Sequence, residues 1–191
     1  MTHRLLAAFL LFALSACAGP PEEIVRAPGD GVSDMRPGMR GPASRELPSG
    51  RRLVADYLLV DKSERLMVAY NNGRPIRAYR DLAFGDAPMG HKRFEGDERT
   101  PEGTYTIDWR NPNSRYHLSL RISYPDERDR AYAASLGRSP GGNIFIHGQP
   151  NGYPGPPLQG DWTDGCIALS NAEIEELWRL VPDGTPIEIR P

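Results

Sequence analysis

The sequence predicts a mostly β domain, a β-rich α+β fold with a few peripheral helices. Its 191 residues include 20 glycines and 19 prolines, which favours short strands joined by defined turns over a helical bundle. Hydrophobic residues make up 39% of the chain, as expected for a globular protein with a sizeable core. The formal net charge is only -2 and no basic stripe is present, so the composition does not indicate a nucleic-acid-binding protein.

Short β-rich runs separated by turn residues support this fold class. Residues 57–60 and 66–70 flank a charged turn, and Asn71-Asn72-Gly73 follows the second run, which is the pattern of successive hairpins. The strands predicted in this way cover residues 57–60, 66–70, 76–82, 103–109, 116–124, 143–147 and 185–190. The sequence contains no internal repeat, no GxGxxG motif and no P-loop.

Two helices are predicted around the strands. The first covers residues 126–136 and ends at Gly137, a residue type that favours helix C-termini. The second begins after Ser170, because Ser170 and Glu173 match a capping box, and it ends before Pro182. One face of this second helix is apolar and is formed by Ile174, Leu177, Trp178 and Val181.

The first 50 residues are predicted to lie outside the folded domain. Residues 5–14 form an apolar run after a basic start, too short to span a bilayer, which is typical of a secretory signal. The sequence Leu14-Ser15-Ala16-Cys17 resembles the lipobox of bacterial lipoproteins, although an ordinary signal peptide with a chance cysteine is the alternative. The predicted organisation is a signal peptide over 1–16, a lipidated Pro/Gly-rich tether over 17–50 and a folded domain over 51–191.

The lipobox resemblance implies a location as well as an anchor. A lipidated Cys17 would attach the chain to a membrane, and the tether would place the domain about 30 Å from that surface on average. Ala18 follows the cysteine instead of an aspartate, which favours the outer membrane of a Gram-negative bacterium. We therefore expect an exported lipoprotein that faces the periplasm. A spacer that serves no target is equally consistent with the composition of the tether.

With Cys17 assigned to a lipid, Cys166 has no disulfide partner. An exported protein seldom keeps an unpaired thiol, so Cys166 is either buried and inert or held ready for chemistry. A nearby imidazole can increase the reactive thiolate fraction, and His147 is the best candidate because it ends an apolar run and precedes Gly148. Gly165 allows close backbone approach, so the amides of Gly165 and Cys166 are candidates for an oxyanion hole.

The motifs around these residues resemble a known family. "IFIHG" followed by "GDWTDGCIALSN" resembles the active-site signature of the L,D-transpeptidase (YkuD-like) catalytic domain. The resemblance covers roughly residues 53–191, and "GDERTPEGTYTI" and "NPNSRYHLSLRISYP" look like the YafK-type branch of the family. The signature residues in this chain are His147, Gly148, Thr163, Gly165, Cys166 and Asn171.

This resemblance implies an enzyme that needs no cofactor and no metal. Cys166 would be the nucleophile, His147 the proton donor and acceptor, and the carbonyl of Gly148 the group that orients His147. The substrate would be a peptidoglycan stem peptide, attacked after the L-centre of meso-diaminopimelate to give a thioacyl-enzyme. An amine would then form a cross-link or attach a protein, whereas water would make the chain a hydrolytic amidase or carboxypeptidase that trims stem peptides or detaches a peptidoglycan-linked protein.

Other residues are weaker candidates. Family relatives often carry arginine two residues after the cysteine, but this chain has Ala168, which leaves the choice between transfer and hydrolysis open. Asp164 beside the nucleophile is predicted to face solvent, because an inward carboxylate would oppose the thiolate. The basic cluster of residues 91–93 is either a solvated loop or a contact for anionic stem peptides, and Trp162 either packs over its loop or lines a groove. The substrate-binding candidates are Thr163, Asn171, Arg99 and Tyr116.

Two rival functions are consistent with parts of the sequence. A zinc peptidase could use three histidines and a cysteine, but the histidines are 26 and 30 residues apart and no HExxH, HxH or CxxC motif is present. A non-catalytic lipoprotein that binds peptidoglycan would require the pair of Cys166 and His147 to be vestigial. The sequence favours the thiol enzyme over both.

Overall fold

The computed structural model describes residues 53–191, and the predictions for the signal peptide, Cys17 and the tether lie outside this range. The described part is β-rich, as predicted, and has two helices and eight strands, one more than the sequence predicted. None of its helices has the length and apolar character needed to cross a membrane. The elements are β1 (Tyr57–Asp61), β2 (Leu66–Asn71), β3 (Arg74–Tyr79), β4 (Gly103–Ser114), β5 (His117–Ile122), α1 (Glu127–Ser135), β6 (Phe145–His147), β7 (Ile167–Ala168), α2 (Asn171–Leu180) and β8 (Pro186–Arg190).

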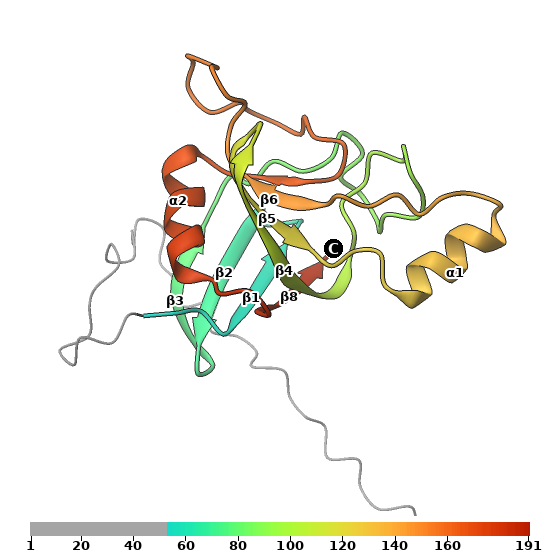
Figure 1. The fold of residues 1–191 in the computed structure, drawn as a ribbon, viewed down its shortest axis with the longest axis horizontal. Helices are drawn as coiled ribbons and strands as arrows, with labels where there is room; N and C mark the ends of the chain where they lie inside the picture. The colour runs from blue at the N-terminus through green and yellow to red at the C-terminus, as the bar shows by residue number, and fades with distance from the viewer. Residues whose placement is uncertain (1–52) are drawn as a thin grey trace, which may run out of the picture.

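All eight strands join in one mixed sheet of order β3-β2-β1-β8-β4-β5-β6-β7 (Figure 1). The first three strands form antiparallel hairpins, and the last strand of the chain, β8, lies between β1 and β4. β8 runs parallel to β1, and β6 runs parallel to β7 at the sheet edge. The C-terminal strand β8 therefore joins the β1–β3 hairpins to strands β4–β7 within the sheet.

The core lies between the sheet and α2, which packs against β5 and β6. The capping box predicted at Ser170 and Glu173 is present, since each residue's side chain bonds to the other's backbone N–H. Three of the four predicted apolar residues of α2 are fully buried, and Trp178 packs at the margin of the core. Each large aliphatic side chain buried in this way stabilises the fold by about 1.5–3 kcal/mol.

Helix α1 depends on polar contacts more than on apolar burial. Asp126 caps it in a reciprocal capping box with Asp129, and Gly137 follows its end with a φ of 65°, as the sequence predicted. Only Asp129 and Ala133 of this helix are buried, and Figure 1 shows α1 projecting from the body of the domain. A few specific hydrogen bonds therefore attach α1 to the rest of the domain.

Two strands differ from the prediction, β3 and β7, and both differences concern segments that lie next to the loop of Cys166. β3 ends at Tyr79, not at residue 82, because Asp81 adopts a φ of 56° and the chain turns away from β2. The next residues form bridges to a distant segment, Ala83 with Ala168 and Gly85 with Thr163. β7 has two residues and was not predicted, since so short a strand shows no alternation in sequence.

One ion pair ties the Cys166 segment to the β1–β2 hairpin. Both guanidinium Nη atoms of Arg65 donate to the Asp161 carboxylate, at 2.8 and 2.6 Å, and Phe84 N–H donates to the same group at 2.8 Å. Burial opposes the charge of Asp161, but the hydrogen bonds from Arg65 and Phe84 hold its pKa below the usual range. The loop that carries Cys166 is thus anchored by charge at its start.

Replacing this carboxylate should weaken the domain. We expect Asp161→Asn to lower the free energy of unfolding in urea by about 1–2 kcal/mol at pH 7, because it removes a charge-assisted pair that is partly screened by solvent. The folded-state pKa of Asp161 is depressed, so this contribution should disappear as pH falls below about 4. Asp183→Asn is the matched control; its more exposed pair with Arg110 should contribute at most about 0.5 kcal/mol. Equal losses for the two variants would contradict the anchoring role.

Candidate active site

A cavity of about 920 Å³ lies along β6 and contains both predicted catalytic side chains, Cys166 and His147. Its wall includes the turn between β4 and β5 at the His147 end. The segment 139–143 and the loop that carries Glu95 form the other end, where Glu95 N–H donates to Ser139 O at 2.9 Å. We call this space the Cys166 cavity.

The Cys166 thiol is partly buried and is not in a disulfide. Phe145 N–H donates to Sγ at 3.4 Å, and the thiol faces the carbonyl oxygen of Asn143 at 3.6 Å. Burial raises the pKa of this thiol to about 11, and the negative charge of Asp164 acts in the same direction. The Phe145 amide and the Lys92 ammonium oppose the shift without cancelling it. Cys166 is therefore a protonated thiol at neutral pH.

His147 is buried and held in one orientation. It lies on β6 between Ser119 of β5 and Ala168 of β7, and its side chain is only 3% exposed. Nδ1 lies 2.7 Å from the Gly148 carbonyl oxygen, so Nδ1 carries the proton and Nε2 is left as the acceptor. Burial lowers the pKa of His147, although the Gly148 carbonyl works against this effect. The ring is a neutral base at neutral pH.

Aromatic rings fix the other faces of the imidazole. The ring of Tyr116 lies 4.5 Å from that of His147, centroid to centroid, and the indole of Trp162 meets it edge-on at 5.7 Å. Tyr116 and Trp162 both line the Cys166 cavity. Of the adjacent pair Tyr116 and His117, it is Tyr116 that faces the cavity, while His117 Nε2 bonds to Glu175 at 2.8 Å.

The thiol and the imidazole share the cavity but are not ion-paired at rest. Within residues 53–191 no hydrogen bond joins Cys166 to His147, because Sγ faces Asn143 and Phe145 instead. The sequence predicts that His147 increases the thiolate fraction of Cys166 by pairing with it, whereas in the structure the two side chains are not paired. The physical reason for this difference is burial, which favours the neutral form of both groups.

Gly165 allows the Cys166 loop to pass against the chain. Its φ is 119°, and a Cβ atom there would lie 2.5 Å from the carbonyl oxygen of Arg99. Its N–H donates to Thr163 Oγ1 at 3.2 Å, and that hydroxyl donates to the Cys166 carbonyl at 2.8 Å. The Gly165 amide is therefore occupied, whereas the Cys166 N–H donates no hydrogen bond within the described range. Of the two amides predicted for an oxyanion hole, only that of Cys166 is free to bind an oxyanion among the described residues.

The four substrate-binding candidates divide into two kinds. Thr163 and Tyr116 line the Cys166 cavity. Asn171 does not; its Oδ1 accepts from Gln149 N–H at 2.8 Å and lies where a Cβ on Gly148 would clash. Arg99 does not line the cavity either, because its guanidinium extends toward Gly90 while its carbonyl packs on Gly165. We therefore regard Asn171 and Arg99 as residues that shape the loops around the site.

The structure also places Asp164 and Ala168, which lie two residues before and after Cys166 in the sequence. Asp164 is exposed, as expected, yet it lines the cavity and its charge still raises the pKa of Cys166. Ala168 is 2% exposed and pairs with Ala83 on one side and His147 on the other. The position at which relatives often carry arginine is thus inside the sheet of this chain and outside the cavity lining.

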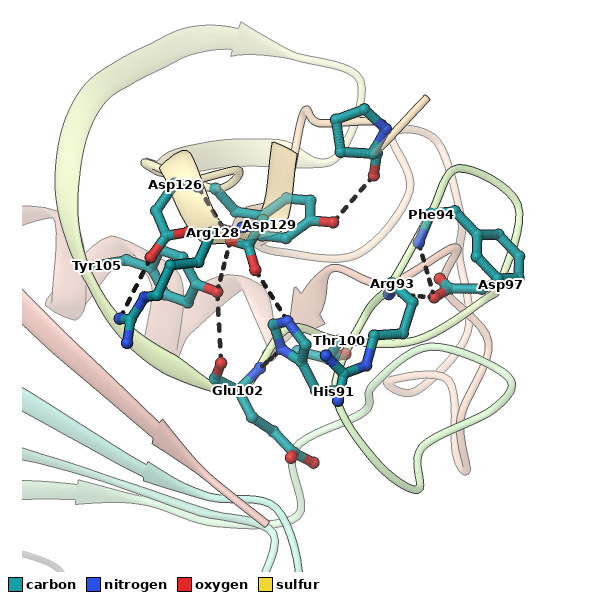
Figure 2. A network of polar contacts seen from close by, with 12 residues as sticks. His91, Arg93, Phe94, Asp97, Thr100, Glu102, Tyr105, Asp126, Arg128 and Asp129 are labelled. Atoms are coloured by element: carbon teal, nitrogen blue, oxygen red, sulfur yellow. Dashed lines mark hydrogen bonds and ion pairs between the residues drawn. The ribbon is translucent and has the colours of Figure 1, made fainter. Parts of the chain in front are cut away.

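The basic cluster of residues 91–93 is neither a solvated loop nor a simple anion contact (Figure 2). His91 accepts from Glu102 N–H at 2.9 Å and lies 2.9 Å from Asp129 of α1, beside a second cavity of about 350 Å³. Lys92 is 3% exposed and paired with Asp97 at 2.9 Å. Two of the three residues therefore hold α1 and the loop in place, and only Arg93 is exposed.

The part of the chain that the structure describes holds no group of three or more His, Cys, Asp or Glu side chains suited to a metal ion. The zinc-peptidase hypothesis therefore gains no support from the arrangement of His91, His117 and His147. Sequence reasoning missed Asn143, Phe145 and Arg115, which also line the cavity. The first two act through backbone groups, and an exposed arginine in a turn carries no sequence signal of its own.

Comparisons with known proteins point to one family. The profile of the L,D-transpeptidase catalytic domain (YkuD) matches residues 55–189. YafK of Escherichia coli K12, which its name assigns only provisionally to the L,D-transpeptidases, is 26% identical over an alignment of 147 residues that covers 73% of this chain and 52% of YafK. The chain thus spans about half the length of the curated relatives that it matches.

Two solved structures share the fold of this chain. The helical cell shape determining protein Pgp2 of Campylobacter jejuni is 28% identical with a TM-score of 0.57, over 71% of this chain and 47% of Pgp2. Bd1075 of Bdellovibrio bacteriovorus is 27% identical with a TM-score of 0.50, over 72% of this chain and 48% of Bd1075. The resemblance seen in the sequence motifs is confirmed. Because the profile match extends over well more than half of the residues, the chain belongs to the L,D-transpeptidase catalytic domain (YkuD) family.

Proposed function

We propose that this chain is a cysteine-dependent L,D-transpeptidase that acts on peptidoglycan stem peptides containing meso-diaminopimelate. The observation that supports this proposal most strongly is that Cys166 and His147 line one cavity while the Gly148 carbonyl holds His147 Nδ1. A nucleophile, a base with a free nitrogen and a group that orients the base are the parts that thiol acyl transfer requires. Membership of the family adds the class of reaction.

In the first half-reaction, Sγ of Cys166 attacks the carbonyl carbon that follows the L-centre of diaminopimelate. The thiol proton moves to Nε2 of His147 as the S–C bond forms, since both groups start neutral. Negative charge develops on the carbonyl oxygen, and the Cys166 N–H is the open amide that can receive it. The C–N bond then breaks, and the proton on Nε2 passes to the departing amine, which is D-alanine for a tetrapeptide.

In the second half-reaction, an acceptor attacks the thioacyl carbon and gives its proton to His147 Nε2. The C–S bond breaks, and the proton returns to Sγ, which restores the neutral pair. An amine acceptor yields a cross-link or an attached protein. Water yields a shortened stem peptide or detaches a peptidoglycan-linked protein, and this hydrolytic function is the alternative to transfer. The two functions share the thioacyl-enzyme and differ only in the second nucleophile.

The proposal extends to the location of the chain. The lipobox-like sequence that ends at Cys17 supports an exported lipoprotein, anchored by its lipid in the outer membrane of a Gram-negative bacterium and facing the periplasm. The tether of residues 17–50 then gives the domain access to the peptidoglycan layer. A non-catalytic protein that only binds peptidoglycan is the more distant alternative.

Cys166→Ala tests the proposed activity directly. The full chain would be incubated with purified sacculi or tetrapeptide muropeptides, with and without an added D-amino acid, and the products read by mass spectrometry. We expect exchange of the terminal D-alanine for the added amine, and complete loss of exchange in Cys166→Ala, because the thioacyl bond cannot form. Cys17→Ala is the matched control and should keep the activity.

Each product of that experiment selects one function. A tripeptide that depends on Cys166 and forms whatever amine is present would establish the hydrolytic alternative. Activity retained by a folded Cys166→Ala variant would rule out the thiol mechanism. Sacculi that bind the chain without any change that depends on Cys166 would favour the non-catalytic alternative.

The resting thiol should show its high pKa in its reactivity. We expect the rate of Cys166 alkylation by iodoacetamide to rise about tenfold per pH unit between pH 7 and 9, because only the thiolate reacts and the pKa is about 11. Peptide mapping separates Cys166 from Cys17. Asp164→Asn should increase the rate at each pH, since its charge helps to raise the pKa. A constant rate between pH 6 and 8 would instead reveal a preformed thiolate–imidazolium pair.

His147→Ala should separate base catalysis from thiol reactivity. Turnover of muropeptides should fall by about 10²–10⁴-fold, the usual contribution of a general base, while alkylation at pH 9 should change far less. His117→Ala is the control, because His117 bonds to Glu175 outside the cavity and should leave turnover intact. Equal losses of turnover and alkylation would mean that His147 acts by forming the thiolate.

A further inference from the structure

We propose that Arg115 binds the terminal carboxylate of the stem peptide and thereby selects substrates whose departing residue ends in a free carboxylate. This inference rests on the proposed function and assigns part of its specificity to one residue. Among residues 53–191, Lys92 and Arg115 are the two Lys or Arg side chains that line the Cys166 cavity. Lys92 is 3% exposed and already paired with Asp97. Arg115 is exposed and makes no ion pair or side-chain hydrogen bond in this part of the chain.

The turn that carries Arg115 is rigid. Asn151 N–H donates to the Arg115 carbonyl at 2.9 Å, and the Asn151 side chain donates to Ser114 O at 2.9 Å and accepts from His117 N–H at 2.8 Å. One asparagine therefore clamps both sides of the β4–β5 turn. An arginine on a fixed backbone loses less conformational freedom when it binds an anion, which favours a built contact over an incidental surface charge.

The position of the turn matches the chemistry of the departing group. Tyr116 follows Arg115, and its ring lies 4.5 Å from that of His147, centroid to centroid. His147 must come within hydrogen-bond reach of the amine that leaves, because it gives that amine a proton. In D-alanine the carboxylate sits on the carbon next to this nitrogen. Arg115 lines the same cavity as His147, so its side chain is available to meet this carboxylate, and guanidinium is suited to carboxylates.

The charges at the other end of the cavity favour the same orientation. Three carboxylates, those of Glu95, Glu98 and Asp164, also line the cavity, and Asp164 is close enough to Cys166 to raise the pKa of its thiol. Gly141 lies against Glu95, which places this carboxylate at the 139–143 end of β6 (the β4–β5 turn and the green loop flank β6 in Figure 1). A substrate carboxylate is repelled by these groups and attracted by Arg115. The cavity thus has a polarity that sets the direction of the stem peptide.

The inference is tested with two stem tetrapeptides that differ only in having a terminal carboxylate or a terminal carboxamide. Binding is measured on the full chain carrying Cys166→Ala, and turnover on the full chain with Cys166 intact. We expect the carboxylate form to bind and react about tenfold better, the effect of one charge-assisted hydrogen bond in a partly solvated site. Adding Arg115→Ala should bring both ratios close to one by weakening the carboxylate form alone.

Two variants control for structure. Arg115→Lys keeps the charge and should retain part of the preference, whereas Arg130→Ala removes an exposed arginine of α1 outside the cavity and should keep all of it. A preference that survives Arg115→Ala, or none in the unsubstituted chain, overturns the inference. Arg115→Ala could instead remove a preference for diaminopimelate over lysine in the stem peptide. Arg115 would then bind the side-chain carboxylate of diaminopimelate, and this result also overturns the inference.

The binding arm separates this inference from the proposed function. A preference in binding that Arg115→Ala removes, without any turnover, supports the inference and counts against the transpeptidase. Turnover that depends on Cys166 but is equal for the two tetrapeptides supports the enzyme and overturns the role of Arg115. Absence of both binding and turnover overturns both.

Discussion

The parallel pairing of β6 with β7 is the interaction on which the site depends. It places His147 opposite Ala168 and thereby brings the residue two positions earlier, Cys166, to the same cavity. A two-residue strand cannot hold its own register, so other contacts hold it. Leu169 N–H donates to His147 O at 2.9 Å, Ala83 bridges the outer side of β7, and the Arg65–Asp161 pair fixes the start of the loop. The position of Cys166 is thus decided by the contacts at this edge of the sheet.

Burial sets the electrostatics of the pair. Both side chains lie where the charged form is disfavoured, so the thiol of Cys166 and the imidazole of His147 rest as neutral groups. The orienting group is the Gly148 carbonyl and not a carboxylate. A neutral dipole fixes the tautomer of the imidazole without adding a full negative charge near the thiol, which would raise its pKa further. In the proposed mechanism, proton transfer would therefore accompany attack, and the thiolate would form only as the substrate carbonyl is attacked.

Local patterns in the sequence predicted most of the fold, and long-range contacts explain the rest. The capping box of α2 and the β1–β2–β3 hairpins involve residues a few positions apart, so their signals are complete within a short window. β7 depends on pairing with β6 on one side and on a bridge to Ala83 on the other, and both partners are distant in the sequence. Cys166 and His147 were recognisable by residue type and motif, but the roles of Arg99 and Asn171 were not. Those roles depend on which backbone each packs against, which sequence spacing does not encode.

Where relatives often carry arginine this chain has a buried Ala168, so the charge that meets the proposed substrate would come from another element. An arginine at this position would start on the same face of the sheet as His147, at a site that is only 2% exposed, where an unpaired guanidinium is destabilising. The β4–β5 turn has no such restriction, because its tip is exposed and clamped by Asn151. In this chain the thiol and the imidazole rest in a buried setting that favours their neutral forms, whereas a group that is to recognise a carboxylate keeps its charge near water. Placing the two functions on a buried sheet edge and on an exposed rigid turn satisfies both requirements within one cavity.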